Sequence, residues 1–303
     1  MMDFSSVISL SSVENHKYLD QVYDLLRENY STRELLNLCT AADPVARAEF
    51  LGRDFVQRVR SGEIISCTQL STRGDKTIAA LMSVKPYTPR NRFLITKSVP
   101  DNSLTEAEIE PARTNYAKDN VNDVTDAFIS ELDKAAFEYV TSNKDRDPRL
   151  KSFLQALGEI HNNEWRVVEV GRAISTKAAQ PFASAILGQW CFIKAWRLGA
   201  KFAIGHVNNN GLRVALASPG YVLASLVLKD SKVLHRRESE PVNSPRLLLL
   251  HQPLQQHHES ESESESEPES ESKSDRQTYL TEYYILFDLD EQAQKNGWAA
   301  AVL

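Results

Sequence analysis

One run in the second half of the chain constrains the fold more than any other. It begins with a strand-like apolar segment, WRVVEVGRAI (residues 165–174). A short loop leads into an apolar helical pattern over 181–198, which we expect to end at Gly199 because glycine is common just past a helix. A second buried strand follows at 202–207. This succession of strand, helix and strand predicts helices packed against a sheet.

The remaining elements are predicted from the same kinds of pattern. Apolar residues at helical spacing indicate helices, and continuous or alternating apolar runs indicate strands. In chain order they are a strand at 7–10, a helix that begins at a capping box at 11–14 and continues to about 30, a helix at 44–62, a hairpin of strands 64–70 and 77–84, helices at 123–140 and 149–160, a short helix at 212–217, and strands at 221–228 and 279–289. Together they predict one α/β domain over 1–303, with a mixed sheet and helices on both faces.

Two segments depart from this regular pattern. Residues 88–160 form an excursion that carries two extra helices, and its first part, 88–121, is polar with three prolines. Residues 235–277 are dominated by the repeat ESESESESEPESESKS (259–274), which has no apolar residue. Such a segment cannot offset its ordering entropy by burial, so we expect a disordered acidic loop insertion. Its alternating Ser and Glu also make it a candidate kinase target.

Charge and cysteine content argue against several classes of protein. The net charge is -6 and the basic residues are scattered, whereas nucleic-acid binding needs a clustered basic face. No window approaches the eighteen consecutive apolar residues of a membrane span, and the first residues lack the pattern of a secretory signal. The three cysteines, Cys39, Cys67 and Cys191, are too far apart for a disulfide framework or a metal motif. We therefore expect a cytoplasmic protein without a metal.

The loop after strand 165–174 carries a further signal. It reads KAAQPFASAILGQW (177–190), in which Gln180, Ala183 and Ala185 form a Q-x-x-A-x-A pattern. Free amides and the positive dipole end at a helix start attract anions. This loop follows a strand and opens a long helix, and it resembles the Q/R-x-x-G-x-G/A loop with which GNAT acetyltransferases bind the pyrophosphate of acetyl-CoA. The resemblance covers about residues 7–230 and 279–289, and implies a GNAT-like, mostly antiparallel central sheet.

Two other motifs carry the same resemblance. The segment NNGLRVALASPGY (209–221) is similar to the family's N-x-x-A-x-x-L-Y-x-x-x-G-F, with Leu216 where many members have a tyrosine acid. The segment STRELLNL (31–38) is similar to the D-E-P-L-N motif of insect-type arylalkylamine N-acetyltransferases. Glu34 stands where that subfamily has its catalytic base. The helices inserted between the third and fourth strands also resemble that subfamily.

The resemblance implies roles for individual residues. Glu34 would deprotonate the amine, with Glu169 and His206 next as candidates, and Ser218 or Tyr221 would protonate the leaving thiolate. Ala183 replaces a family glycine, which costs close backbone approach but keeps the amide donor. The residues expected to bind acetyl-CoA are Ala173, Ile174, Ser175, Gln180, Phe182, Ala183, Ser184, Ala185 and Asn209.

Structural explanations compete with these roles. Glu169 and Arg172 lie three apart on one strand, so we expect them on opposite faces, where they would simply pair with neighbours. VEVGRAI is also similar to the E-x-x-R of autoinducer-synthase-like acyltransferases, which leaves a longer acyl donor open. Our hypothesis is an acetyl-CoA-dependent N-acetyltransferase acting on a small, arylalkyl-type amine. The alternative is a catalytically inactive GNAT-like protein that binds a ligand or partner.

Overall fold

The central element of the protein is an eight-stranded sheet. The computed structural model describes residues 4–34, 36, 44–71, 76–87, 123–160, 164–180, 182–208, 220–229, 232–234 and 280–300. The strands within these ranges are β1 (Ile8–Ser9), β2 (Ile65–Leu70), β3 (Ile78–Pro86), β4 (Val167–Ser175), β5 (Phe202–Asn208), β6 (Gly220–Lys229), β7 (Lys232–Leu234) and β8 (Leu280–Asp288).

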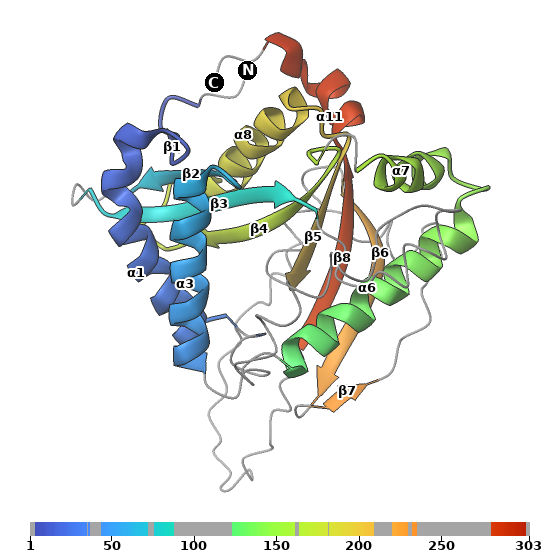
Figure 1. Cartoon of the computed structure of the whole chain (residues 1–303), viewed down its shortest axis with the longest axis horizontal. Coiled ribbons are helices and arrows are strands. Elements are labelled where there is room, and N and C mark those ends of the chain that lie inside the picture. The colour runs from blue at the N-terminus through green and yellow to red at the C-terminus, as the bar shows by residue number, and fades with distance from the viewer. Residues whose placement is uncertain are drawn as a thin grey trace, which may run out of the picture.

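The strand order in this sheet is β1-β2-β3-β4-β5-β8-β6-β7. Every neighbouring pair is antiparallel except β4 and β5, which run parallel. The predicted mixed, mostly antiparallel sheet is therefore confirmed, and its order is consistent with a GNAT-type fold (Figure 1). The predicted hairpin is β2 and β3, and the short strand β7 was not predicted from the sequence.

The helices match the predicted ones with small changes at their ends. They are α1 (Leu19–Thr32), preceded by the 3-10 helix η1 (Val13–Tyr18), then α3 (Pro44–Ser61), α6 (Asp123–Asn143), α7 (Pro148–Gly158), α8 (Ala183–Arg197), α11 (Leu289–Asn296) and the 3-10 helix η3 (Trp298–Ala300). The sequence did not predict α11. None of the described helices is long and apolar enough to cross a membrane.

Local chemistry explains several of these boundaries. Asp147 caps α7, because its side chain accepts a hydrogen bond from the Arg149 amide at 3.0 Å, and Pro148 follows at the first helical position. The helix α8 ends just before Gly199, whose φ of +103° is a conformation that favours glycine. The predicted stop at Gly199 is thus confirmed.

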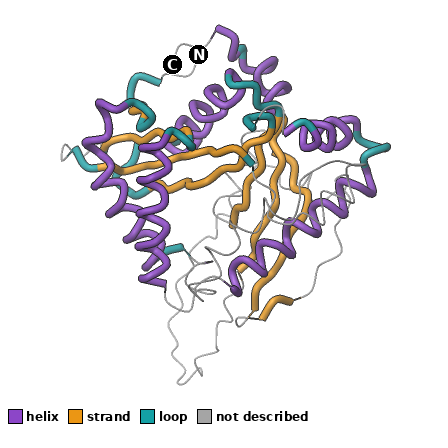
Figure 2. The backbone as a smooth tube through the Cα atoms, in the orientation of Figure 1, coloured by secondary structure: helices purple, strands orange, loops and turns teal. Residues whose placement is uncertain are grey.

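The helices pack on both faces of the sheet, as predicted (Figure 2). On one face lies the α8 cluster, in which α8 and α11 pack on the strands. On the other face lie two separate clusters: the α1–α3 cluster over one half of the sheet, and the α6 cluster, formed by α6 and α7, over the other (Figure 1). Representative members are Leu187, Trp190 and Ile193 for the α8 cluster, Leu26, Phe55 and Leu81 for the α1–α3 cluster, and Leu132, Phe153 and Tyr284 for the α6 cluster.

The α8 cluster also holds two cysteines that are distant in sequence. The Sγ atoms of Cys67 on β2 and Cys191 on α8 lie 3.5 Å apart, and both thiols are free and fully buried. Burial raises the pKa of the Cys67 thiol, so this side chain is unreactive in the folded protein. Cys191 is likewise a core residue.

Three sequence predictions concern residues outside the described ranges. They are the polar segment 88–121, the short helix at 212–217 and the acidic loop 235–277. The described parts of the excursion 88–160 contain α6 and α7, which are the two extra helices predicted there.

Candidate active site

One face of the sheet carries a polar stretch between two apolar clusters. Along β3, Leu81 packs in the α1–α3 cluster, and Tyr87, just beyond the strand, packs in the α6 cluster. Residues alternate between faces along a strand, so Ser83 and Lys85 lie on this same face, between the two clusters. Polar groups at the centre of a sheet are costly to bury unless they are paired. The polar stretch is therefore the place to look for a site.

The parallel strands β4 and β5 separate at this place and form a fork. They pair over three residues only, Val167–Glu169 with Phe202–Ile204. Beyond this point β4 continues alongside β3, and β5 continues alongside β8 (Figure 1). Among the described residues, the edge of β4 that faces β5 has no strand partner from Val170 to Ser175. An extended ligand with amide groups can add to such an edge as a further strand.

A bulge at Gly171 lies directly beyond the fork point. In the β3–β4 register Ser83 faces Arg172 and Val84 faces Val170, so Gly171 is left unpaired. The Ser83 hydroxyl accepts a hydrogen bond from the Arg172 amide at 2.8 Å. A Cβ atom at position 171 would lie only 2.8 Å from that hydroxyl oxygen. The bulge therefore requires glycine here.

This bulge corrects one prediction from the sequence. Glu169 and Arg172 were expected on opposite faces, but they face Lys85 and Ser83 in the β3–β4 register, and those two residues share a face. The unpaired residue shifts the alternation by one, so Glu169 and Arg172 lie on the same, polar face. The Arg172 guanidinium carbon lies 5.1 Å from the ring centre of Tyr30 on α1.

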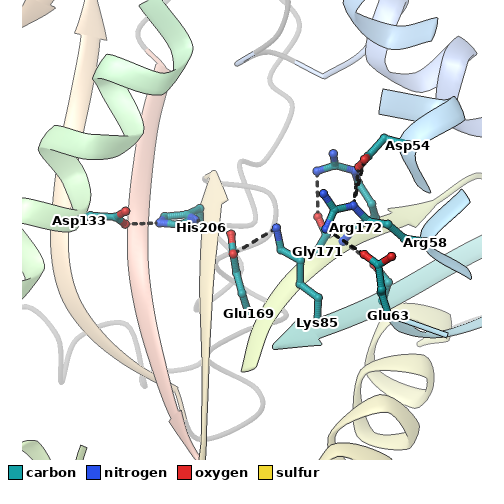
Figure 3. A network of polar contacts seen from close by, with 10 residues as sticks. Asp54, Arg58, Glu63, Lys85, Asp133, Glu169, Gly171, Arg172 and His206 are labelled. Carbon is teal, nitrogen blue, oxygen red and sulfur yellow. Dashed lines mark hydrogen bonds and ion pairs between the residues drawn. The ribbon is translucent and has the colours of Figure 1, made fainter. Parts of the chain in front are cut away.

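Four charged or titratable side chains form a chain across the fork (Figure 3). Oδ1 of Asp133, on α6, lies 2.8 Å from Nε2 of His206 on β5. Nδ1 of His206 lies 3.8 Å from Oε1 of Glu169, and Oε2 of Glu169 lies 3.3 Å from Nζ of Lys85. Asp133 and Glu169 are only 2% and 4% exposed. The fold thus brings together two predicted catalytic candidates, Glu169 and His206, and adds Asp133 and Lys85 to them.

This arrangement gives the two nitrogens of His206 different roles. When Asp133 is ionised it can only accept a hydrogen bond, and Nε2 of His206 then carries the proton of the contact. Nδ1 is then the nitrogen that can take up or release a proton on the side of Glu169. The Tyr284 ring packs edge-on against the imidazole with a centre-to-centre distance of 5.2 Å. Burial raises the pKa of the Tyr284 phenol well above its usual range, so this neighbour remains neutral.

Glu34 lies two residues beyond the end of α1. Its backbone amide donates to the Asn29 carbonyl oxygen at 2.9 Å, and its Oε1 accepts from the Leu36 amide at 3.2 Å. Leu36 packs against the α6 cluster, although α1 belongs to the α1–α3 cluster. This segment therefore passes from one pair of helices to the other. Burial and then the charge of Glu34 raise the pKa of Glu282, on β8, to about 8.

The predicted phosphate-binding loop is the start of α8. The Gln180 carbonyl oxygen accepts from the Ala183 amide at 3.2 Å, and that of Phe182 accepts from the Ala185 amide at 2.9 Å and from the next amide at 3.0 Å. Of the first four amides of α8, that of Ser184 has no acceptor among the described residues. Phe182 has a left-handed backbone, with a φ of +62°, and an 83% exposed side chain.

Ala183 stands where the acetyl-CoA loop motif has a glycine, and the question is whether its methyl group obstructs a bound anion. Its side chain is 2% exposed and belongs to the α8 cluster. The methyl group is therefore enclosed by the core and does not fill the space in front of the helix start. The substitution of alanine for glycine does not by itself block an anion from reaching this end of α8.

Comparison with solved structures finds N-acetyltransferases, all at low identity. A mosquito arylalkylamine N-acetyltransferase-like protein, 5b, is 12% identical with a TM-score of 0.48, over 93% of this chain and 99% of that one. The Drosophila melanogaster polyamine N-acetyltransferase, which forms N-acetylagmatine, is 11% identical with a TM-score of 0.45, over 93% and 99%. An N-acetyltransferase of Staphylococcus aureus is 6% identical with a TM-score of 0.43, over 94% and 99%. No protein-family model and no curated protein matches the sequence.

The other predicted site residues lie in three different places. On β4, Ala173 and Ser175 are exposed beside the free edge, whereas Ile174 is buried in the α1–α3 cluster. Asn209 and Ser218 lie outside the described residues. Tyr221 is described, but its hydroxyl donates to Oε2 of Glu291 at 2.8 Å, which places it in a contact with α11 and not beside His206.

Three residues of the site, Lys85, Asp133 and Glu282, were missed in the sequence, although the last two carried a signal. Asp133 lies four residues before Phe137, which is buried in the α6 cluster, so an acidic residue interrupts the apolar stripe of that helix. Glu282 alternates with Tyr284 and Leu286 on the core-facing side of β8. In the described part of the chain, no group of three His, Cys, Asp or Glu residues is placed to hold a metal ion.

Proposed function

We propose that this protein is an N-acetyltransferase that transfers the acetyl group of acetyl-CoA to a small amine, with an arylalkylamine as the preferred type. The observation that carries the proposal is the fork between β4 and β5 with His206 and Glu169 at its apex. A free strand edge, a bulge and titratable side chains meet there, and each can support one part of acyl transfer. They hold an extended donor, bind the oxyanion and move a proton.

The residues at the fork fit the donor. The pantetheine arm of coenzyme A carries amide groups, which suit the unpaired edge of β4 from Val170 to Ser175. Gly171 leaves the bulge without a side chain, and Ala183 turns its methyl group into the core. The start of α8, with the Ser184 amide and hydroxyl, is the candidate contact for the pyrophosphate.

The chemistry at the fork is a direct transfer. Glu34 takes a proton from the ammonium form of the acceptor, so that the neutral nitrogen can attack the thioester carbonyl. The new C–N bond forms, the C–S bond breaks, and the leaving thiolate takes up, through water, the second proton that the attacking nitrogen loses. Backbone amides along the free edge of β4 stabilise the oxyanion. His206, held by Asp133, is the second group able to move a proton there.

Acetyl-CoA binding is the first test. A ligand that binds the folded state raises the apparent melting temperature, so we expect a rise of a few degrees at about 1 mM acetyl-CoA. Desulfo-CoA, which keeps the pyrophosphate and pantetheine, should give a similar rise. Absence of any shift at millimolar concentrations of both ligands would contradict the proposal.

An assay of thiol release with a panel of amines tests the transfer and its base. We expect Glu34→Gln to lose roughly 100-fold or more of kcat, whereas Glu14→Gln, at an exposed glutamate of η1, should match the wild type. If Glu34→Gln remains active, the role of base passes to His206 or Glu169.

Binding of acetyl-CoA without thiol release for any amine would favour the inactive ligand-binding alternative. A faster reaction with longer acyl-CoA thioesters would favour the acyltransferase alternative.

A further inference from the structure

The side chain of Glu282 is a buried carboxyl group that the proposed reaction does not yet use. It is 4% exposed, and no described residue gives it a hydrogen bond or an ion pair. A buried carboxylate without a partner is strongly unfavourable, so such a group either keeps its proton or meets a cation that the protein itself does not supply.

The position of Glu282 places it at the polar face of the fork. In the β5–β8 register His206 faces Tyr284 and Asn208 faces Glu282. Side chains two residues apart on a strand share a face, so Glu282 lies on the side of the sheet that carries His206. Tyr284 belongs to the α6 cluster on that side. Glu282 therefore lies two residues along β8 from Tyr284, the residue that faces His206 of the Asp133–His206 pair.

A second carboxyl group approaches Glu282 from another part of the chain. The Glu34 carboxylate accepts a hydrogen bond from the Leu36 amide, and Leu36 packs against the α6 cluster that borders Glu282. The charge of Glu34 is, after burial, the second cause that raises the pKa of Glu282. Neighbouring carboxyl groups repel each other when both are ionised, so a shared proton or a cation stabilises such a pair.

We infer that Glu282 and Glu34 together form the binding site for the positively charged ammonium group of the acceptor substrate. This inference rests on the proposed acetyltransferase function. The substrate class is a primary alkylammonium or arylalkylammonium ion, which supplies three N–H donors and one positive charge to the two carboxylates. Glu282 anchors the cation, and Glu34 removes the proton that frees the nitrogen for attack.

Proton release gives this site a distinctive signature. Glu282 has a pKa of about 8, so it is mostly protonated at pH 7. An ammonium ion that binds between the carboxyl groups favours the ionised form of Glu282 and displaces its proton. Binding at pH 7 should therefore release most of one proton into the buffer.

The test is isothermal titration calorimetry of the full chain with 2-phenylethylammonium and with neutral 2-phenylethanol, without any acyl donor. We expect the wild type to bind the cation about tenfold or more tightly than the alcohol. Titrations in phosphate and HEPES buffers, which differ in ionisation enthalpy and contain no primary ammonium ion, measure the released proton. In Glu282→Gln the preference should fall to within about threefold and the proton release should vanish, whereas Glu14→Gln should keep both.

Two results would overturn the inference. One is a wild type that binds the alcohol as tightly as the cation, and the other is a Glu282→Gln variant that keeps the preference. Glutamine has nearly the same shape and removes a buried charge, so the variant should fold, which circular dichroism and thermal melting can verify. If the cation preference and proton release are observed but no acyl-CoA thioester releases thiol, the proposed transferase function fails while the ammonium site stands.

Discussion

Nε2 of His206 lies 2.8 Å from Oδ1 of Asp133, although 73 residues separate the two in the chain. Asp133 reaches His206 from α6, a helix of the excursion between β3 and β4, and both side chains are largely buried. The excursion therefore completes the polar network at the fork. The inserted helix α6 thus contributes the Asp133 carboxylate, which orients the His206 imidazole.

Asp133→Asn tests whether this carboxylate orients His206. Asparagine can still accept the Nε2 hydrogen bond, but it cannot stabilise the charged imidazolium. We expect kcat to fall roughly 10- to 100-fold, with KM changed by less than about threefold. The nitrogen-15 resonances of the His206 ring should change in the variant, because the partner of Nε2 has lost its charge.

Asp145→Asn is the matched control, because Asp145 is an exposed aspartate in the turn after α6. It should leave kcat and the His206 resonances unchanged. An Asp133→Asn variant with wild-type kcat and unchanged His206 resonances would reduce Asp133 to a structural residue.

Gly171→Ala tests the bulge beside the free edge of β4. The added Cβ would lie 2.8 Å from the Ser83 hydroxyl oxygen, so we expect a loss of about 1–3 kcal/mol in the free energy of unfolding. Adding Ser83→Ala removes the clashing atom and should recover part of that loss in urea denaturation. Gly188→Ala is the control, since its Cβ meets only the flexible end of Met82 at 3.4 Å, and should change stability by less than about 1 kcal/mol. Additive effects of the Gly171 and Ser83 substitutions would contradict the contact.

Ala183→Gly tests the role of the alanine at the start of α8. Because its methyl group is buried in the α8 cluster, glycine should cost about 1 kcal/mol of stability through lost packing and helix propensity. The Kd for acetyl-CoA should change by less than about threefold, since the methyl group does not occupy the space in front of the helix. A tenfold gain in affinity, measured by calorimetry, would instead mean that alanine hinders the cofactor.

The stability of the protein should fall with rising pH in a way that depends on Glu282. Its pKa is about 8 in the folded protein against an ordinary value of 4.5, so between these values the folded state holds a proton that the unfolded state has lost. The contribution is fully present below about pH 4.5 and is lost as the pH rises through about 8, and it amounts to at most about 5 kcal/mol. Urea denaturation should show Glu282→Gln gaining on the wild type from pH 5.5 to pH 8.5. Parallel stability curves for the two proteins would contradict the raised pKa.

Local patterns were sufficient for most of the regular elements. The glycine at 199 ended α8, and Pro44 began α3, because each residue acts through its own backbone geometry. The apolar runs of β4 and β5 were recognisable for the same reason, since burial on a sheet selects apolar side chains along the strand itself. His206 and Glu169 could therefore be placed on these strands from the sequence.

Contacts between distant segments could not be predicted in this way. The bulge at Gly171 depends on how β4 meets β3, and it moved Arg172 to the face of Glu169, against the expectation from strand alternation. A single unpaired residue moves every later side chain of the strand to the opposite face of the sheet. No pattern in the neighbouring residues shows where such a bulge occurs.

The sequence by itself determined most of the elements, their order and the class of sheet, because helix and strand periodicities depend on neighbouring residues. Only the tertiary structure decided which polar groups meet: Asp133 with His206, and Glu169 with Lys85. Those pairs depend on the fork between β4 and β5 and on the helices that cover it. Their chemistry comes from burial and proximity in space, which no single stretch of the chain encodes.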